Sequence, residues 1–348
     1  MTAARLLVLG GTGYLGAPAA RALRAAGHDV TSLSRSGRSP ADGMRAIAAD
    51  RSDPDALARA LEGERFDVTV DFAAYDSADV ERLLLIPHAA LGLYILISSG
   101  QVYLVTENPP IPSREEDSER PLLAEPAVGT PDHGQWAYGI GKRRAERAAL
   151  VLRDSHGVRA VVLRLPVIHG EGDPRRRLWR YLERLKDGGP VILPDDGAQA
   201  TRYLWVEDVA RAVVRVLGIE RPREAVYNLA GPEIVPLREF LERAARALGA
   251  PAPRFVSAGR EEIAAAGLDA MAWPLSGRWS SVLDPARAEA EWGFTGTPLD
   301  DWLPRVVRAL CDHPPDPIEG EDARRVRELA FAARRVGEPG LTPEKARD

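Results

Sequence analysis

The sequence has little of what several classes of protein depend on. Cys311 is the only cysteine, which excludes an intramolecular disulfide and a cysteine-rich metal site. The histidines and carboxylates form no cluster with the spacing of metal ligands, so we expect no metal. No apolar run approaches the length that a bilayer requires, and the longest, over residues 83–97, is interrupted by Pro87 and Gly92. We therefore expect no membrane partner.

The charge balance excludes another class of partner. The net charge is −5, and the arginines are spread along the chain rather than clustered, so we expect no nucleic acid partner. The first residues lack the pattern of a secretory signal, and a single cysteine fits a reducing compartment, so we expect a cytoplasmic protein. A chain of 348 residues can bury a substantial core in one large or two modest domains.

Glycines gather near the start of the chain, directly after a short apolar run over residues 6–9. Gly10, Gly13 and Gly16 follow this run, and helix-forming residues then continue to Gly27. This spacing lets a strand turn tightly into a helix and lets the backbone approach a pyrophosphate at the helix N-terminus. A glycine-rich turn without a ligand is the alternative. We predict a dinucleotide site whose further contacts in this loop are Thr12, Tyr14 and Leu15.

The end of the second expected strand indicates which dinucleotide is bound. Units that bind NAD carry an acidic residue there, which accepts hydrogen bonds from the ribose 2′-hydroxyl. Here Ser34 is followed by Arg35 and Arg38 without a carboxylate between them. Two guanidiniums suit a 2′-phosphate, although an ordinary basic surface loop is the alternative. We expect NADP as the cofactor, with NAD as the second possibility.

The first half of the chain alternates between two hydrophobic patterns. They predict strands over 5–9, 30–34, 45–48, 67–72, 93–98 and 158–165, and helices over 14–26, 54–62, 78–90 and 136–155. Such alternation is typical of a parallel sheet that is covered by helices on both faces. We therefore predict an α/β fold with a Rossmann-type, doubly wound parallel sheet and a smaller C-terminal α/β substrate lobe.

The pattern changes twice along the chain, which suggests a division into domains. We expect a cofactor-binding domain over 1–165, a mainly substrate-binding lobe over 166–311 and a charged tail over 312–348 with a possible surface helix. The stretch 106–135 within the first domain is rich in Pro, Glu and Ser. We interpret it as a mobile flap near the site, and a solvated insertion without function stays equally open.

Hydroxyl and amine side chains with catalytic potential follow the fifth expected strand. Ser98 and Ser99 end this strand, where the ligand crevice of such a sheet lies. Tyr138 and Lys142 are four residues apart and therefore share one face of a helix. A nearby ammonium lowers the pKa of a phenol, which then can move a proton at a carbonyl or hydroxyl. Taken alone, such a pair is more often a surface contact, but its place behind the glycine motif and the two serines favours catalysis.

Taken together, these motifs resemble the extended branch of the short-chain dehydrogenase/reductase superfamily, which includes the NAD-dependent epimerases and dehydratases. The resemblance runs from residue 6 to about residue 310. It implies that Tyr138 is the general acid/base, that Lys142 binds the nicotinamide ribose, and that Ser99 holds the reacting oxygen. It further implies cofactor contacts from Asp50, Arg51, Phe72, Ala73, Ala74, Ser98, Pro166, Val167 and Ile168, and substrate contacts from Ser99, Gln101, Tyr103, His169 and Arg202.

Departures from the family pattern narrow the expected function. Val167 stands where nucleotide-sugar enzymes usually carry an asparagine that contacts substrate, which weakens a nucleotide-sugar substrate. We expect a net reductase that transfers hydride between the nicotinamide and a carbonyl carbon of a small molecule. Two alternatives stay open: an epimerase or dehydratase that retains NAD, and a non-catalytic protein that senses the cofactor or associates with RNA.

The resemblance also implies a homodimer through helices 4 and 5 of the family. The helix expected over 136–155 carries small and apolar residues that suit such an interface, although the same face could be core. These residues are Ala145, Ala148, Ala149 and Leu152.

Overall fold

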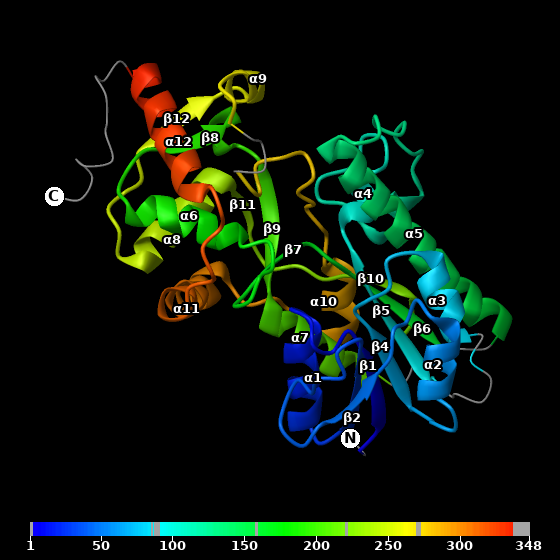
Figure 1. Ribbon diagram of the computed structural model, residues 1–348. Coiled ribbons are helices and arrows are strands. Elements are labelled where there is room, and N and C mark those ends of the chain that lie inside the picture. The colour runs from blue at the N-terminus through cyan, green and yellow to red at the C-terminus, as the bar shows by residue number, and fades with distance from the viewer. Residues whose placement is uncertain are drawn as a thin grey trace. The chain divides into compact units, whose positions relative to one another are not determined.

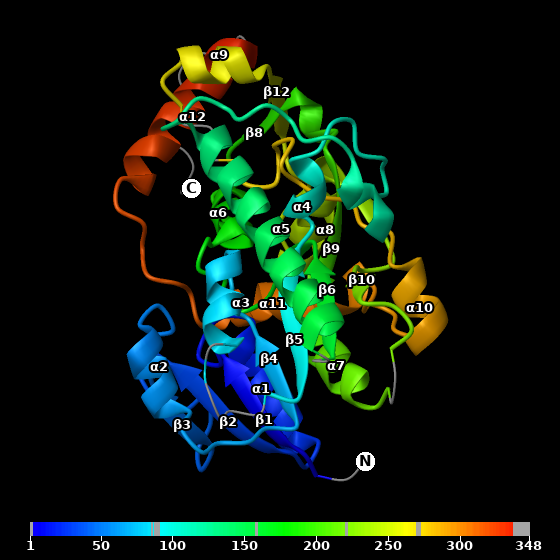
Figure 2. The same ribbon diagram turned by 90° about the vertical axis from the view of Figure 1, so that its right-hand side faces the viewer.

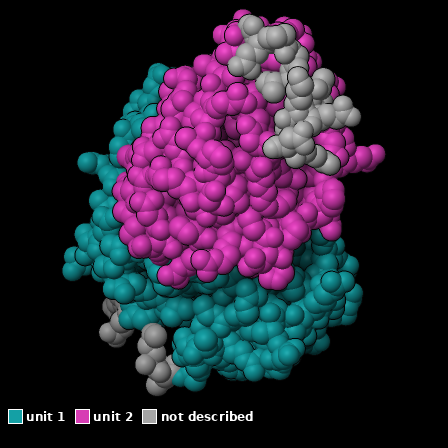
Figure 3. Space-filling model, turned by 90° about the vertical axis from the view of Figure 1, so that its left-hand side faces the viewer, with its two compact units in different colours: residues 1–168, 204–231, 281–296 teal, residues 169–203, 232–280, 297–348 magenta. Residues whose placement is uncertain are grey.

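The computed structural model describes residues 3–84, 86, 91–156, 159–219, 222–268 and 273–336, which fall into two compact units (Figure 3). Unit 1 contains residues 1–168, 204–231 and 281–296, and unit 2 contains residues 169–203, 232–280 and 297–348. This division differs from the continuous one expected at residues 165 and 311. Two later segments return to unit 1, because one supplies an edge strand of its sheet and both add to its core.

A seven-stranded sheet forms the centre of unit 1. Its order is β10-β6-β5-β4-β1-β2-β3, and every pair of neighbours is parallel. The strands are β1 (Arg5–Leu9), β2 (Asp29–Ser34), β3 (Arg45–Ala48), β4 (Val68–Asp71), β5 (Leu93–Ser99), β6 (Ala160–Leu165) and β10 (Val226–Asn228). The sheet is the predicted doubly wound, Rossmann-type one.

Helices cover both faces of this sheet (Figures 1 and 2). One face carries α1 (Gly16–Ala25) and α7 (Val206–Leu217), and the other carries α2 (Pro54–Ala60), α3 (Ser77–Leu84) and α5 (Pro131–His156). The part of the predicted helix 78–90 that lies beyond Leu84 falls mostly outside the described residues. Unit 1 also contains α4 (Gln101–Leu104) and α10 (Ala286–Trp292), and β7 (Val167–His169) runs from unit 1 into unit 2.

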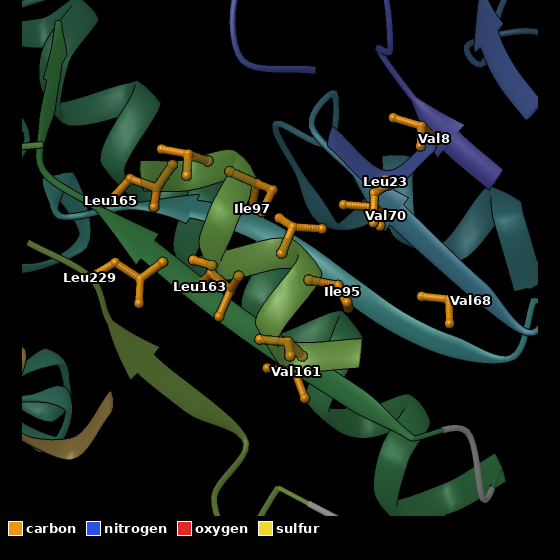
Figure 4. Packing of buried hydrophobic residues seen from close by; sticks show 14 of the residues in the cluster. Val8, Leu23, Val68, Val70, Ile95, Ile97, Val161, Leu163, Leu165 and Leu229 are labelled. Atoms are coloured by element: carbon orange, nitrogen blue, oxygen red, sulfur yellow. The ribbon is translucent and has the colours of Figure 1, made fainter. Parts of the chain in front are cut away.

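The core follows the period of two that a strand buried on both faces requires. Leu6 and Val8 of β1 pack on the side of α1 and α7, in the cluster of Figure 4, whereas Leu7 and Leu9 pack on the opposite side. The same alternation holds in β5 and β6. It explains why short, continuous apolar runs were sufficient to predict these strands.

The face of α5 that was expected to form a dimer interface belongs to this core. Ala145 and Ala149 are fully buried against the sheet within one chain, and Ala148 packs beside them. The side chain of Leu152 lies outside the described residues. A homodimer therefore stays a prediction, and these alanines do not support it.

The first part of the expected flap is anchored rather than loose. Thr106 pairs with Leu122 in a β-bridge, and Ser113 pairs with Leu283. The buried carboxylate of Glu115, at the start of a 3-10 helix over Glu115–Glu119, accepts a hydrogen bond of 2.8 Å from the backbone of Asn228. The contact of Glu115 ties this part of the segment to the edge strand β10, and the role of the flap stays a prediction.

Unit 2 combines short strands with amphipathic helices. In it β8 pairs in parallel with β12, and β9 pairs antiparallel with β11. Its elements are α6 (Arg177–Lys186), β8 (Val191–Pro194), β9 (Ala200–Trp205, which ends in unit 1), β11 (Ile234–Pro236), α8 (Leu237–Leu248), β12 (Phe255–Ala258), α9 (Arg260–Ala265), α11 (Leu299–Asp312) and α12 (Glu321–Val336).

Helix α12, which lies in the expected tail, is part of the core of unit 2. Its residues Leu329 and Phe331 are buried. Glu328 is fully buried and forms an ion pair with Arg184 of α6, with Arg184 Nε 2.9 Å from Glu328 Oε2. Although the sequence of this segment is highly charged, it forms a helix that packs into the core of unit 2.

We expect Glu328→Ala to destabilise the protein by about 3 kcal/mol, because the buried Arg184 guanidinium loses its closest carboxylate and keeps Glu321 at 3.5 Å. Urea unfolding followed by circular dichroism measures the change. Asp322→Ala removes an exposed carboxylate from the same helix and serves as the matched control. Equal midpoints for the two variants would show that the pair contributes nothing.

Candidate active site

Most candidate residues of unit 1 lie at the carboxyl edge of the sheet. The segments that follow β2, β1, β4, β5 and β6 are neighbours there, because these strands are adjacent and parallel. The ends of these strands and the segments that follow them contain residues 34–38, 10–16, 72–74, 98–99 and 166–168. A ligand crevice at this edge is the rule for open α/β sheets.

The glycine loop has the close approach that its sequence predicted. Gly10 has a φ of +75°, and a Cβ on Gly16 would lie 2.2 Å from the carbonyl oxygen of Gly10. No side chain caps the N-terminus of α1, whereas Thr12 and Gly13 are exposed in front of it. The loop therefore offers bare backbone to a phosphate, and it fits the pyrophosphate of a dinucleotide.

Two further segments adjoin this loop. A Cβ on Gly10 would lie 3.2 Å from the Cβ of Ala73, which follows β4. The hydroxyl of Tyr14 donates a hydrogen bond of 3.4 Å to the carbonyl oxygen of Ile168, after β6. The residues expected around the two ends of the dinucleotide are thus brought together.

The turn after β2 presents its arginines to solvent. Arg35 and Arg38 are both exposed, and Ser36 Oγ lies 3.3 Å from Ser34 Oγ. Asp50 is exposed as well, and hydrogen bonds from Ser52 lower the pKa of its carboxyl, with a smaller contribution from Arg35. The side chains that could meet an adenosine 2′-phosphate are therefore accessible.

Arg51 differs from the expectation, because its guanidinium is turned into the protein. It forms two hydrogen bonds to the buried carboxylate of Asp71, of 2.7 and 2.9 Å. Tyr94 also donates to Asp71, and the backbone N–H of Ala73 donates to it at 2.8 Å. Arg51 thus supports the turn after β4, and its side chain is not available to a cofactor.

Lys142 occupies a buried position on α5, with only 3% of its surface exposed. Its ammonium donates hydrogen bonds to the carbonyl oxygens of Ala74 (2.7 Å) and Ile97 (3.0 Å). Burial lowers the pKa of Lys142 to about 8, and the carboxylates of Asp71 and Glu146 oppose this shift. The lysine therefore carries a charge at neutral pH and loses it within the accessible range.

Tyr138 lies half-buried one turn before Lys142, as the spacing predicted. The Lys142 ammonium is 6.0 Å from the centroid of its ring. Tyr75 adds a second ring, whose centroid is 6.4 Å from that of Tyr138. Ser99 is half-buried at the end of β5, and its hydroxyl accepts a hydrogen bond of 3.2 Å from the backbone of Gln101. This group of side chains has the chemistry that proton transfer to a carbonyl requires.

Three other residues expected at the site face inward instead. The hydroxyl of Ser98 donates to Glu146, because alternate side chains of β5 point to opposite faces. Tyr103 is fully buried and bonds to Asn228 and Arg164, each at 2.7 Å. The amide of Gln101 is buried and donates to the backbone of Gln135. We therefore remove these side chains from the candidate ligand contacts.

His169 and Arg202 lie in unit 2, and His169 is corrected there. It is 1% exposed and stacks on Phe240 and Trp302, with ring centroids 5.1 and 5.7 Å away. Burial lowers the pKa of His169 to about 3, so the ring is neutral. It also lines a small cavity of this unit. His169 is a core residue, whereas Arg202 is half-buried on β9 and donates to the backbone of Pro232 at 3.0 Å.

Sequence reasoning missed three residues around Lys142. Glu146 is four residues after Lys142, and this spacing was the available signal for it. Asp71 had a weaker signal as a carboxylate at the end of a buried strand. Tyr75 had none, since its position depends on how the turn after β4 packs against α5.

The described parts of the chain contain neither a membrane-spanning helix nor a cluster of metal-ligating side chains. None of the helices there is long and apolar enough to cross a membrane. Within the same residues, no three histidine, cysteine or carboxylate side chains are grouped as a metal site would require.

Comparison with known proteins identifies the family. The model of the NAD dependent epimerase/dehydratase family matches residues 6–230. The chain is 31% identical to 2'-dehydrokanamycin reductase of Streptomyces kanamyceticus, over 80% of this chain and 76% of that protein. It is 28% identical to the chloroplast stem-loop binding protein of 41 kDa b of Arabidopsis thaliana, over 72% of this chain and 65% of that protein.

Solved structures agree on the fold. The dTDP-glucose 4,6-dehydratase of Streptomyces venezuelae, solved with NAD bound, superposes with a TM-score of 0.66 over 89% of this chain and 97% of that chain, at 22% identity. The fold and the carboxyl-edge site define the class as an extended short-chain dehydrogenase/reductase, an NAD(P)-dependent oxidoreductase. Within that class, the chain belongs to the NAD-dependent epimerase/dehydratase family.

Proposed function

We propose that the protein is an NADP-preferring net reductase of a carbonyl group on a small molecule. The observation that carries this proposal is the turn after β2, where Arg35 and Arg38 are exposed and no carboxylate stands between them. A reductase must exchange its cofactor in every turnover, and NADPH is the usual reductant for biosynthetic carbonyl reduction. The reductase among the relatives adds support. The single cysteine favours a cytoplasmic location.

Each side chain of the site has its own role in the proposed reaction. The nicotinamide, when bound against the segments of residues 72–74 and 166–168, supplies the hydride. Tyr138 donates its hydroxyl proton to the carbonyl oxygen as the carbon becomes an alcohol carbon. Ser99 donates a hydrogen bond to the same oxygen and orients it. Lys142 stabilises the resulting phenolate by its charge and keeps one N–H group for the ribose, since two are used by Ala74 and Ile97.

The cofactor preference gives a direct test. We expect the double variant Arg35→Ala/Arg38→Ala to weaken NADPH binding about 30-fold, because two charge-assisted contacts to the 2′-phosphate are lost. NADH binding changes less than about 2-fold, since NADH lacks that phosphate. Fluorescence titration of the purified protein with each nucleotide measures both affinities.

Arg59→Ala is the matched control, because Arg59 is exposed in the last turn of α2, away from the carboxyl edge. It should leave both affinities unchanged. NAD that survives desalting of the wild-type protein, detected by mass spectrometry, would instead favour an epimerase or dehydratase. Tighter binding of NADH than of NADPH would also contradict the proposal.

A further inference from the structure

Tyr75 is an exposed aromatic residue beside the proposed proton donor. It is 58% exposed, and it is the only aromatic among the strongly exposed large hydrophobic residues in the described ranges. Tyr75 lies at the carboxyl edge of the sheet, where a ligand is expected to bind, so its ring is placed to contact that ligand.

The backbone of Tyr75 is held on both sides. Its N–H donates a hydrogen bond of 2.8 Å to Asp79 Oδ2, at the start of α3. Its carbonyl oxygen packs against Gly141 of α5, where a Cβ would lie only 2.4 Å away. Gly141 lies between Tyr138 and Lys142 in sequence, so the turn that carries Tyr75 is fixed directly on the catalytic helix.

The ring of Tyr75 extends from this fixed turn toward the catalytic pair. Its centroid is 4.9 Å from the Lys142 ammonium and 6.4 Å from the centroid of the Tyr138 ring, with 51° between the two planes. The ammonium holds one part of the ring by a cation–π contact, while most of the side chain stays open. A rigid backbone with an exposed ring is the arrangement of a preformed binding wall.

We propose that Tyr75 is a specificity-determining residue that contacts the substrate and favours cyclic over open-chain ketones. This proposal rests on the proposed reductase function and names its substrate class. A saturated cyclic ketone presents one face of C–H bonds to the phenol while its oxygen meets Tyr138. An open-chain ketone must lose internal rotational freedom to cover the same area of the Tyr75 ring. Contact with this ring therefore contributes less to its binding free energy.

The experiment compares a cyclic and an open-chain ketone with the same number of carbons, starting with cyclohexanone and a linear hexanone. NADPH-dependent reduction is measured for the wild type, Tyr75→Ala and Tyr75→Phe. We expect the wild type to have the higher kcat/KM for the cyclic ketone. Tyr75→Ala should lower that value about 10-fold through KM and leave the linear ketone within about 2-fold, whereas Tyr75→Phe keeps the preference.

Three results would overturn the proposal, and a fourth would remove its basis. Equal kcat/KM values for cyclic and linear ketones in the wild type would exclude ring selection. An equal loss for both ketones with a shifted pH profile would mean that Tyr75 acts only through Lys142. A weaker NADPH affinity in Tyr75→Ala with an unchanged ketone KM would place the ring against the cofactor. A wild type that reduces no ketone would instead refute the proposed function itself.

Discussion

We expect Tyr138→Phe to lower kcat/KM for carbonyl reduction by about 10³-fold and to change NADPH affinity by less than about 2-fold. The variant keeps the ring that packs near Tyr75 and loses only the hydroxyl that would donate the proton. The proposed cofactor contacts lie on the glycine loop and on the turns after β2, β4 and β6, which this substitution leaves unchanged. Steady-state reduction of the best ketone and fluorescence titration with NADPH measure the two quantities.

A matched control is available in the same unit. Tyr227→Phe removes a hydroxyl that donates a 2.7 Å hydrogen bond to Glu291 near the edge strand β10, and it should retain turnover. Full activity of Tyr138→Phe would contradict general acid catalysis by this residue. Cellular function that Tyr138→Phe retains in full would instead revive the non-catalytic alternative, in which the protein senses a cofactor or associates with RNA; one relative is named as a chloroplast stem-loop binding protein.

The strands of unit 1 were predictable because their signal is local. β1 over Arg5–Leu9 and β3 over Arg45–Ala48 have the expected bounds, since buried parallel strands read as short apolar runs between turn residues. The short strands of unit 2 were not predictable in this way. β8 and β12 have four residues each and pair across the sixty residues of chain between them. Their pairing depends on tertiary packing rather than on a local pattern.

The placement of a side chain was predictable where one motif fixes both its position and its direction. The spacing of Tyr138 and Lys142 on one helix face is such a case, and so is the glycine loop. Motif position alone does not say where a side chain points. Tyr103 and Ser98 occupy expected positions, yet both point into a buried network around Glu146 and Arg164. Arg51 was misjudged because its partner Asp71 is twenty residues away and becomes a neighbour only in the folded sheet.

The choice of lysine at position 142 places a charge that titrates near neutral pH one helix turn after Tyr138. Lys142 is one of only three lysines in a chain that otherwise uses arginine for positive charge. An arginine would stay charged at every accessible pH, whereas a buried lysine titrates near neutrality. The pKa of about 8 results mainly from burial, with Asp71, Glu146 and Asp79 favouring the charged form and Arg51 opposing it.

The pH dependence of the reaction follows from this value. Below about pH 8 the free enzyme keeps the Lys142 ammonium, and as the pH rises through 8 the ammonium loses its proton. The neutral amine no longer stabilises a phenolate on Tyr138. We therefore expect kcat/KM for reduction to be constant at lower pH, which gives a plateau. Above pH 8 it should fall about tenfold per pH unit, which gives a descending limb, since kcat/KM reports the free enzyme.

Lys142→Met should remove that limb of the profile and lower the plateau of kcat/KM by about 10²- to 10³-fold, because the charge beside Tyr138 is then absent at every pH. Lys186→Met is the control: Lys186 lies over the ring of Trp179 in unit 2, so this variant should keep both the plateau and the limb. A limb near pH 8 that persists in Lys142→Met would have to come from another group. In that case the buried lysine would hold the turn at Ala74 in place without setting the charge on which proton transfer depends.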